Sequence, residues 1–222
     1  DVVSIMMENR IEYLALLVGL NKLGAVSGLL NSNLGGNSLI HCINVTGSSK
    51  CIVGEECMTE LDAIQDQLSL QAGSDFFFVN DGGEKPCPNW AQDLMSSSAE
   101  TSESNPAQTH ETTIGETALY IYTSGTTGLP KAAVLSNRRY LIAADMSALA
   151  GLQCTVKDRI YLCLPLYHAT GLLLGAGAAF ASGASMFVRR KFSASNFLKE
   201  IREHNCSHMI YIGELCLSLI HI

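Results

Sequence analysis

The stretch Tyr122-Thr123-Ser124-Gly125-Thr126-Thr127-Gly128-Leu129-Pro130-Lys131 holds two glycines, four small hydroxyl residues and one lysine within ten positions. An apolar run over residues 117–122 precedes the glycines, and a shorter run over residues 132–135 follows them. Both runs are typical of buried strands. Glycines let backbone N–H groups turn toward an anion, hydroxyls add donors, and lysine adds a charge that suits phosphate. The sequence therefore predicts two adjacent strands joined by a loop that can bind phosphate.

Two interpretations of the loop stay open on composition alone. The common P-loop has Gly-x-x-x-x-Gly-Lys followed by Ser or Thr and leads into a helix. Here the spacing is Gly125-x-x-Gly128-x-x-Lys131, and a strand is expected next. The loop is either a phosphate-binding element of a different kind or a plain surface hairpin. Pro130 stiffens the exit in both cases.

Composition narrows the class of protein. The chain has 222 residues, of which 47% are hydrophobic and 16% charged, as in a packed globular protein. The net charge is −7 and no basic stripe is present, so nucleic acid is not an expected partner and any phosphate site must be local. The eight cysteines form no Cys-x-x-Cys pair, which favours free, buried thiols over a metal or redox site.

Strand and helix patterns alternate along the chain. Expected strands cover residues 25–30, 50–53, 75–79, 117–122, 132–135, 160–164, 184–188 and 207–211. Expected helices cover residues 11–23, 38–45, 55–68, 137–152, 171–181 and 193–204. This alternation predicts an α/β fold in which a layered, largely parallel sheet is flanked by helices.

A change of composition divides the chain. Residues 96–113 are rich in Ser, Thr and Glu and hold almost no large apolar residue, so they are expected to form an exposed loop. We therefore expect a first α/β segment over residues 1–95 and a polar loop over residues 96–114. A second α/β segment over residues 115–222 would contain the glycine loop.

Residues 160–188 contain no Asp, Glu, Lys or Arg, and Gly171 and Gly175 form a Gly-x-x-x-Gly pattern. One interpretation is a membrane span. Pro165, His168 and the strand–turn–helix–strand rhythm favour the other interpretation, in which small residues let a helix lie close to a sheet.

His168 lies in the expected turn after the buried strand at residues 160–164. Ligands of parallel α/β sheets collect at the carboxyl ends of strands. Position alone leaves two roles open for His168, a site residue or a cap of the following helix.

The whole stretch at residues 122–131 resembles the nucleotide-binding signature of adenylate-forming (AMP-binding) enzymes, which include acyl-CoA synthetases, luciferases and peptide-synthetase adenylation domains. Residues 164–171 are similar to a Pro-Leu-x-His-x-x-Gly segment of the same superfamily. The closer resemblance is to the fatty acid transport protein branch, or very-long-chain acyl-CoA synthetases, at residues 31–34, 120–122, 164–168, 190–195 and 211–216. The chain departs from that branch at Gly35, where arginine is usual, and over residues 217–222.

The resemblance implies ATP-dependent activation of long- or very-long-chain fatty acids to acyl-CoA through acyl-AMP, linked to fatty acid uptake. ATP, Mg²⁺ and CoA would take part, with Mg²⁺ bridging phosphate oxygens alongside a glutamate from a later segment. His168 would border the acyl carboxylate as a catalytic residue. The phosphates would be held by Thr123, Ser124, Gly125, Thr126, Thr127, Gly128 and Lys131. The alternative is a non-catalytic fatty acid transport or lipid-binding protein.

The resemblance also implies that residues 1–222 are part of a large N-terminal domain, with later segments and a small C-terminal domain outside them. The chain alone is then expected to be inactive, and a product truncated before its site is complete is a third interpretation. The longer protein is expected to be membrane-associated, at the endoplasmic reticulum or plasma membrane with its site facing the cytosol. A fatty acid is its expected substrate, and self-association into a homo-oligomer is a further expectation.

Overall fold

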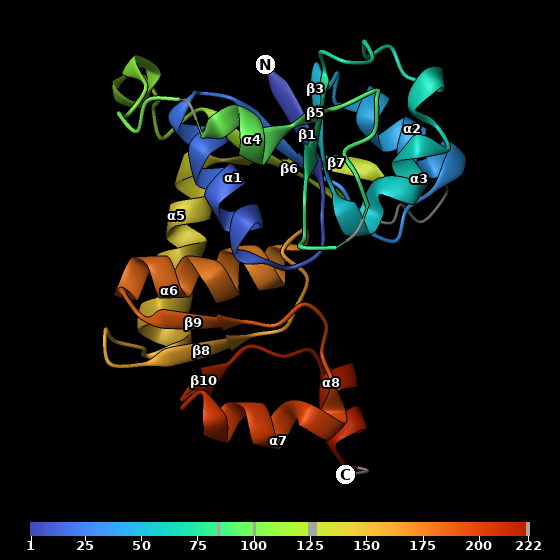
Figure 1. The fold of residues 1–222 in the computed structure, drawn as a ribbon. Helices are drawn as coiled ribbons and strands as arrows, with labels where there is room; N and C mark the ends of the chain where they lie inside the picture. Colours follow the sequence, from blue (N-terminus) through green and yellow to red (C-terminus); the bar gives the residue numbers. More distant parts are fainter. Residues whose placement is uncertain (84, 100, 124–127, 221–222) are drawn as a thin grey trace. The chain divides into compact units, whose positions relative to one another are not determined.

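A computed structural model describes residues 1–83, 85–99, 101–123 and 128–220, which fall into two compact units (Figure 1). The first unit comprises Asp1–Glu8 and Leu14–Asn137. The second comprises Asn9–Tyr13 and Arg138–Ile222. Both are layers of parallel strands and helices, so the predicted α/β fold is confirmed.

The first unit is built on a seven-stranded sheet with the order β5-β4-β3-β1-β2-β6-β7. All neighbouring strands are parallel except β6 and β7, which are antiparallel. The strands are β1 (Val2–Met6), β2 (Val26–Leu29), β3 (Lys50–Gly54), β4 (Phe76–Val79), β5 (Gln92–Asp93), β6 (Thr117–Thr123) and β7 (Lys131–Ser136). The two strands predicted on either side of the glycine loop are confirmed as β6 and β7.

Helices cover both faces of this sheet. Helices α2 (Gly36–Val45) and α3 (Met58–Asp62) lie on one side, and α1 (Ile11–Lys22) and α4 (Leu94–Ser98) lie on the other (Figure 1). The core under α2 and α3 takes buried side chains from strands and helices alike, among them Met6, Leu39, Ile43, Val53, Leu61, Phe76 and Phe78. Each such side chain contributes about 1.5–3 kcal/mol through burial, so this core fixes α2 against the sheet.

The structure divides the chain after Asn137, whereas the sequence suggested a division at residues 96–114. The reason is pairing: β6 is parallel to β2, and β7 is paired with β6. The glycine loop therefore belongs to the first sheet. Residues 96–113 are exposed or half-buried in the described positions, as predicted. They nevertheless include a 3-10 turn at Ala107–His110, and Lys22 Nζ at the end of α1 donates to Asn105 Oδ1 at 2.8 Å.

The continuous helix predicted over residues 55–68 is wrong. It is divided into a 3-10 turn, α3 and a second 3-10 turn, over Glu55–Cys57, Met58–Asp62 and Gln65–Gln67. Two side chains in this segment bind distant groups. The Glu55 carboxylate accepts the backbone N–H of Asp81 at 2.9 Å, and Asp62 Oδ1 accepts Trp90 Nε1–H at 2.6 Å. These bonds fix the segment against residues that follow β4, and a regular helix does not continue.

The second unit has a three-stranded parallel sheet with the order β10-β8-β9. Its elements are α5 (Asn137–Met146), β8 (Arg159–Leu162), α6 (Gly177–Ser182), β9 (Ser185–Val188), α7 (Ala194–Glu203), β10 (His208–Met209) and α8 (Gly213–Ile220). Helices α6 and α7 lie on opposite sides of this sheet (Figure 1). Ile160 packs on the side of Ala178 in α6, and Tyr161 packs on the side of Phe197 in α7. The two-residue alternation of β8 thus serves two separate cores.

The apolar stretch at residues 160–188 is a strand, a helix and a strand, as the second interpretation predicted. The predicted helix at residues 171–181 is present as a π-helical segment, Thr170–Ala176, followed by α6. A Cβ on Gly171 would collide with the Pro165 carbonyl oxygen and lie 2.7 Å from that of Leu164. Gly171 therefore lets the helix approach the end of β8. In the described residues, no helix is both long enough and apolar enough to cross a membrane.

The remaining helices, strands and cysteines agree with the sequence prediction in part. The predicted helix at residues 137–152 is α5 continued by a π-helical segment, Ser147–Leu152. The strand predicted at residues 207–211 is only the two-residue β10, and the sequence did not predict α8. All eight cysteines are free, and the prediction of free, buried thiols is confirmed for the five of them that are buried.

Candidate functional site

The glycine loop leaves the first sheet at the end of β6 and returns at the start of β7. Thr123, the last residue of β6, is the partner of Lys131, the first residue of β7, and its Oγ1 lies 3.5 Å from the Lys131 carbonyl oxygen. Gly128 has a φ of +152°, a conformation that residues with side chains rarely adopt. The predicted site residues Ser124, Gly125, Thr126 and Thr127 lie outside the described residues.

Helix α2 holds the entry strand of the loop through Tyr122. The Tyr122 hydroxyl donates to the Cys42 carbonyl oxygen at 2.7 Å, and Thr46 Oγ1 lies 3.1 Å from the same hydroxyl. Burial raises the pKa of Tyr122 to about 12, so the phenol keeps its proton at neutral pH and remains a donor. The strand that leads into the loop is thus fixed one residue before Thr123.

Helix α2 also contacts the exit of the loop. His41 Nε2 lies 3.0 Å from the carbonyl oxygen of Pro130. A carbonyl oxygen can only accept, so Nε2 carries the hydrogen. One helix therefore makes hydrogen bonds to both legs of the hairpin, at Tyr122 and at Pro130.

A pocket of about 470 Å³ lies beside the loop exit, between α2 and β7. It is lined by His41, Val45, Thr46, Tyr120, Leu129, Pro130, Lys131, Ala132 and Val134. Most of these side chains are apolar, and Lys131 brings a positive charge. Because Lys131 is exposed, its ammonium group stays solvated and can meet a phosphate without first leaving a buried partner.

His168 follows β8 in the second unit, in a turn that begins at Pro165. Its backbone N–H donates to the Pro165 carbonyl oxygen at 3.1 Å, and its own carbonyl oxygen accepts the N–H of Leu172 at 3.0 Å. The imidazole lies against the Tyr167 ring, with 4.6 Å between the ring centres. Partial desolvation lowers the pKa of His168 below its ordinary value, so the ring is neutral at neutral pH. The side chain itself is exposed and open to a ligand.

A buried amide fixes the backbone ahead of His168. Asn9, only 4% exposed, donates through Nδ2 to the carbonyl oxygens of Leu164 at 2.8 Å and Arg189 at 3.2 Å. Its Oδ1 accepts the N–H of Leu166 at 2.8 Å. These bonds join the residues that follow β8 and β9, so the turn that carries His168 has a defined geometry.

The fold separates the predicted site residues into two groups. Thr123, Gly128 and Lys131 belong to the first unit, and His168 belongs to the second. Neither His41 nor Asn9 was predicted from the sequence as a site residue. His41 is one polar residue in a predicted helix, and Asn9 follows the first apolar run, but neither pattern identifies the distant carbonyl that each one binds.

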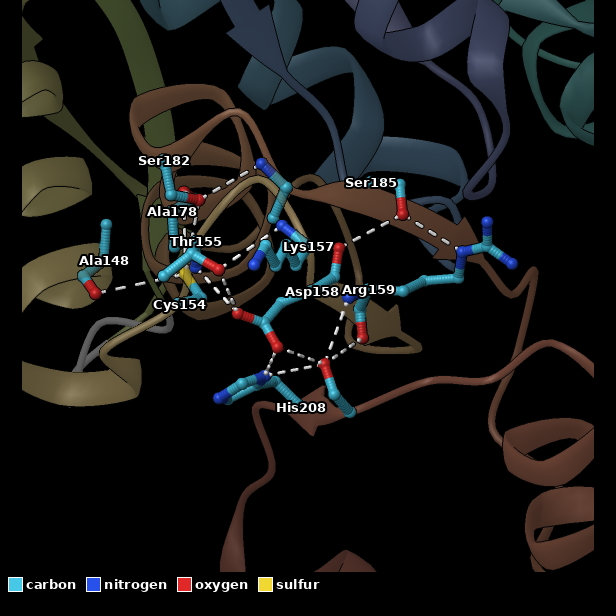
Figure 2. A network of polar contacts seen from close by, with 12 residues as sticks. Ala148, Cys154, Thr155, Lys157, Asp158, Arg159, Ala178, Ser182, Ser185 and His208 are labelled. Carbon is cyan, nitrogen blue, oxygen red and sulfur yellow. Dashed lines mark hydrogen bonds and ion pairs between the residues drawn. The ribbon is translucent and has the colours of Figure 1, made fainter.

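Asp158, Ser207 and His208 form a cluster at the second sheet, and Figure 2 shows the Asp158 and His208 side chains facing each other in it. The Ser207 hydroxyl donates to Asp158 Oδ1 at 2.9 Å, and His208 Nδ1 lies 2.9 Å from Ser207 Oγ and 3.5 Å from the same carboxylate oxygen. In a hydrolase triad the serine and the carboxylate meet different imidazole nitrogens. Here both meet Nδ1, so the cluster ties β8 to β10 and does not activate a nucleophile.

Hydrogen bonds from Thr155 complete this cluster and show its structural role. The backbone N–H and the hydroxyl of Thr155 donate to Asp158 Oδ2 at 2.8 and 2.9 Å. The hydrogen bond from the Thr155 N–H is the largest cause that lowers the pKa of Asp158. Within the described ranges, we find no group of three His, Cys, Asp or Glu side chains that could hold a metal ion.

Comparison with known proteins places these features in a family. The AMP-binding enzyme family profile matches residues 1–221. The chain belongs to this family. It is 38% identical over 219 residues to long-chain fatty acid transport protein 6 of Mus musculus, and the match covers 97% of this chain and 34% of the relative.

Another relative carries the name of a ligase. The medium/long-chain-fatty-acid–CoA ligase FadD6 of Mycobacterium tuberculosis is 30% identical over 221 residues, covering 100% of this chain and 35% of that protein. The chain thus spans about a third of the length of the curated relatives that it matches.

Solved structures share the fold. The N-terminal domain of FACL13 from Mycobacterium tuberculosis, crystallised with an inhibitor, superposes with a TM-score of 0.82 at 21% identity, covering 100% of this chain and 52% of that one. A Mycobacterium tuberculosis fatty acyl CoA synthetase superposes with a TM-score of 0.79 at 20% identity, covering 100% and 41% of the two chains. The α/β architecture is therefore that of the N-terminal domains of adenylate-forming enzymes.

Proposed function

We propose that this chain supplies the nucleotide-binding hairpin of an enzyme that activates long- or very-long-chain fatty acids as acyl-CoA. The observation that carries the proposal is the hairpin between β6 and β7, anchored on α2, with Lys131 exposed at its exit. The names of the relatives, fatty acid transport proteins and fatty-acid–CoA ligases, support a fatty acid as the substrate. Because the chain spans about a third of those relatives, the proposal concerns a protein of their length.

The proposed reaction has two steps. The fatty acid carboxylate attacks the α-phosphorus of ATP, the bond to the bridging oxygen breaks, and pyrophosphate leaves with the electron pair. The thiolate of CoA then attacks the carbonyl carbon of acyl-AMP and displaces AMP. The first step places negative charge on the pyrophosphate, so it requires positive charge and N–H donors at the β- and γ-phosphates.

The hairpin is suited to that requirement. Lys131 would neutralise charge on the leaving pyrophosphate, and N–H and hydroxyl groups between Thr123 and Gly128 would bind phosphate oxygens. His168, neutral and exposed, would border the fatty acid carboxylate. A charged imidazolium at that position would instead form an ion pair with the carboxylate. Mg²⁺ would accompany the triphosphate and neutralise part of its charge.

The longer protein is further proposed to associate with a membrane, at the endoplasmic reticulum or the plasma membrane, with its site facing the cytosol. The relatives named as long-chain fatty acid transport proteins support membrane association. Fractionation of cells that express the longer protein tests this, and recovery in the soluble fraction would contradict it. Formation of a homo-oligomer stays a prediction from the resemblance.

The relatives' names also favour a second function, fatty acid transport or lipid binding without catalysis. Fatty acid-dependent release of AMP from ATP, measured with and without CoA in a protein that spans the relatives' length, separates the two functions. Catalysis predicts pyrophosphate release that needs the fatty acid alone, and release of AMP together with thioester that needs CoA as well. Binding of fatty acid with no AMP release would support transport alone and overturn the enzymatic proposal.

A further inference from the structure

The hydrogen bond between His41 and Pro130 lies outside the apolar core. His41 is half-buried on α2, and its neighbours Leu39, Cys42 and Ile43 fill the core beneath that helix, whereas His41 does not belong to it. Its imidazole lines the pocket beside β7. Its specific contact is the 3.0 Å bond to the Pro130 carbonyl oxygen.

Three constraints meet at the peptide between Pro130 and Lys131. The proline ring fixes its own φ. The peptide unit is planar, so the Pro130 carbonyl and the Lys131 N–H turn together. His41 holds that carbonyl in one direction and thereby limits the ψ of Pro130. Lys131 itself is paired with Thr123 in the antiparallel hairpin.

We propose that His41 is a positioning residue for phosphate binding by Lys131. By orienting the Pro130–Lys131 peptide, His41 sets the direction in which the Lys131 side chain extends toward the phosphates. The inference deepens the proposed function and rests on it, because Lys131 is assigned there to the nucleotide. His41 touches neither the nucleotide nor the fatty acid in this scheme. It acts through the backbone of the loop exit.

Substitutions at His41 test this role in a protein that spans the relatives' length. In His41→Gln, the side-chain amide nitrogen stands the same number of bonds from Cα as Nε2 does, so the donor is kept. In His41→Asn the amide is too short to reach, and His41→Ala removes the donor altogether. Ile40→Ala is the matched control, because Ile40 packs on the core from the same helix and its loss destabilises α2 without removing a loop contact.

Four quantities are measured for each variant: the dissociation constant for ATP, the KM values for ATP and for fatty acid in AMP release with CoA present, and the melting temperature. We expect His41→Ala and His41→Asn to weaken ATP binding about three- to tenfold, the worth of one hydrogen bond, with the KM for fatty acid unchanged. His41→Gln should stay within about twofold of the parent protein. Ile40→Ala should lower the melting temperature and leave the ATP constants unchanged.

The inference is overturned if His41→Ala binds ATP as well as the parent, if both KM values rise together, or if Asn restores binding and Gln does not. A parent protein that binds ATP but releases no AMP when fatty acid and CoA are both present overturns the proposed catalysis instead. In that case the affinities of the variants still decide the role of His41. A parent that does not bind ATP overturns both.

Discussion

Lys131 is expected to matter for catalysis and not for stability. Its side chain is exposed, so it adds little to packing, yet its charge lies at the exit of the glycine loop. We expect Lys131→Ala, in a protein of the relatives' length, to slow acyl-AMP formation about 100-fold, as the loss of a charge-stabilising group does. The free energy of unfolding should change by no more than about 0.5 kcal/mol.

Single-turnover measurement of acyl-AMP, together with thermal unfolding, checks both parts of this prediction. Lys157→Ala is the control, because it removes the same charge from another exposed position of the chain. Normal acyl-AMP formation by Lys131→Ala would contradict the assigned role. So would a variant that unfolds.

Glu55 makes the stability of the first unit depend on pH. Its carboxylate is buried and accepts backbone N–H groups from Asp81, Gly83 and Lys85 at 2.9, 3.1 and 3.1 Å. These hydrogen bonds, that from Asp81 first, lower the pKa of the carboxyl in the folded state. The unfolded state then binds the proton more readily, so the stabilisation is present above the ordinary pKa of about 4.3 and is lost as pH falls below it.

We expect Glu55→Gln to lower the melting temperature at pH 7, because the amide presents a donor to N–H groups that need an acceptor. The variant should also lose less of its stability than the parent between about pH 5 and pH 3, since it has no carboxyl to protonate there. Circular dichroism melts across that range measure both effects. Parallel pH curves for parent and variant would show that another group controls acid unfolding.

Gly171 determines how closely the helix Thr170–Ala176 approaches the residues after β8. A methyl group there would strike the carbonyl oxygens of Pro165 and Leu164, and backbone atoms cannot rotate away as side chains do. We expect Gly171→Ala to cost about 1–3 kcal/mol of unfolding free energy through overpacking. Chemical denaturation of the 222-residue chain measures this cost.

Gly19 in α1 provides the matched control, because a Cβ built there meets nothing within 4 Å. Gly19→Ala should be neutral or stabilise the chain by up to about 1 kcal/mol, as expected in a helix interior. Equal effects of the two substitutions would mean that close packing at Gly171 is not what the glycine provides.

The sequence predicted the parts of the structure that depend on neighbouring residues. The strands on either side of the glycine loop follow from two apolar runs, and the loop from its glycines. His41 and Asn9 could not be predicted, because their hydrogen bonds join residues 89 and 155 positions apart. The broken helix after Glu55 has the same origin, since the acceptor role of its carboxylate appears only once Asp81, Gly83 and Lys85 have folded against it. Periodicity reports which face of an element is apolar, and it carries no information on such distant polar partners.

The sheet of the first unit comes from one continuous stretch of chain, whereas the second unit is made of two separate stretches. Every strand of the seven-stranded sheet lies within residues 1–137, together with the core beneath α2 and α3. The second unit takes Asn9–Tyr13 from the other end of the chain, including the buried Asn9 amide. A polypeptide of residues 138–222 therefore lacks the group that joins the residues after β8 and β9.

We expect residues 1–137 expressed alone to unfold cooperatively in urea, because they contain their own core and sheet. Residues 138–222 alone should be less stable than the same unit in the whole chain, since Asn9 contributes about 1–3 kcal/mol by satisfying buried backbone groups. Urea melts of the two pieces and of the whole chain measure this. A broad, non-cooperative transition for residues 1–137 would contradict the division.

The order of strands in the first sheet also governs how the protein can assemble as it leaves the ribosome. Among the described strands β1 is synthesised first, and its two neighbours β2 and β3 are the next to emerge. The sheet can then grow through β4 to β5, but the outer edge of β2 has no partner until Thr117–Thr123 has been translated. For that interval the nascent chain presents unpaired backbone groups to other nascent chains and to chaperones. Synonymous codons that slow translation across residues 96–116 would lengthen this exposure. The time at which β6 can pair with β2 therefore depends on how fast this polar segment is translated.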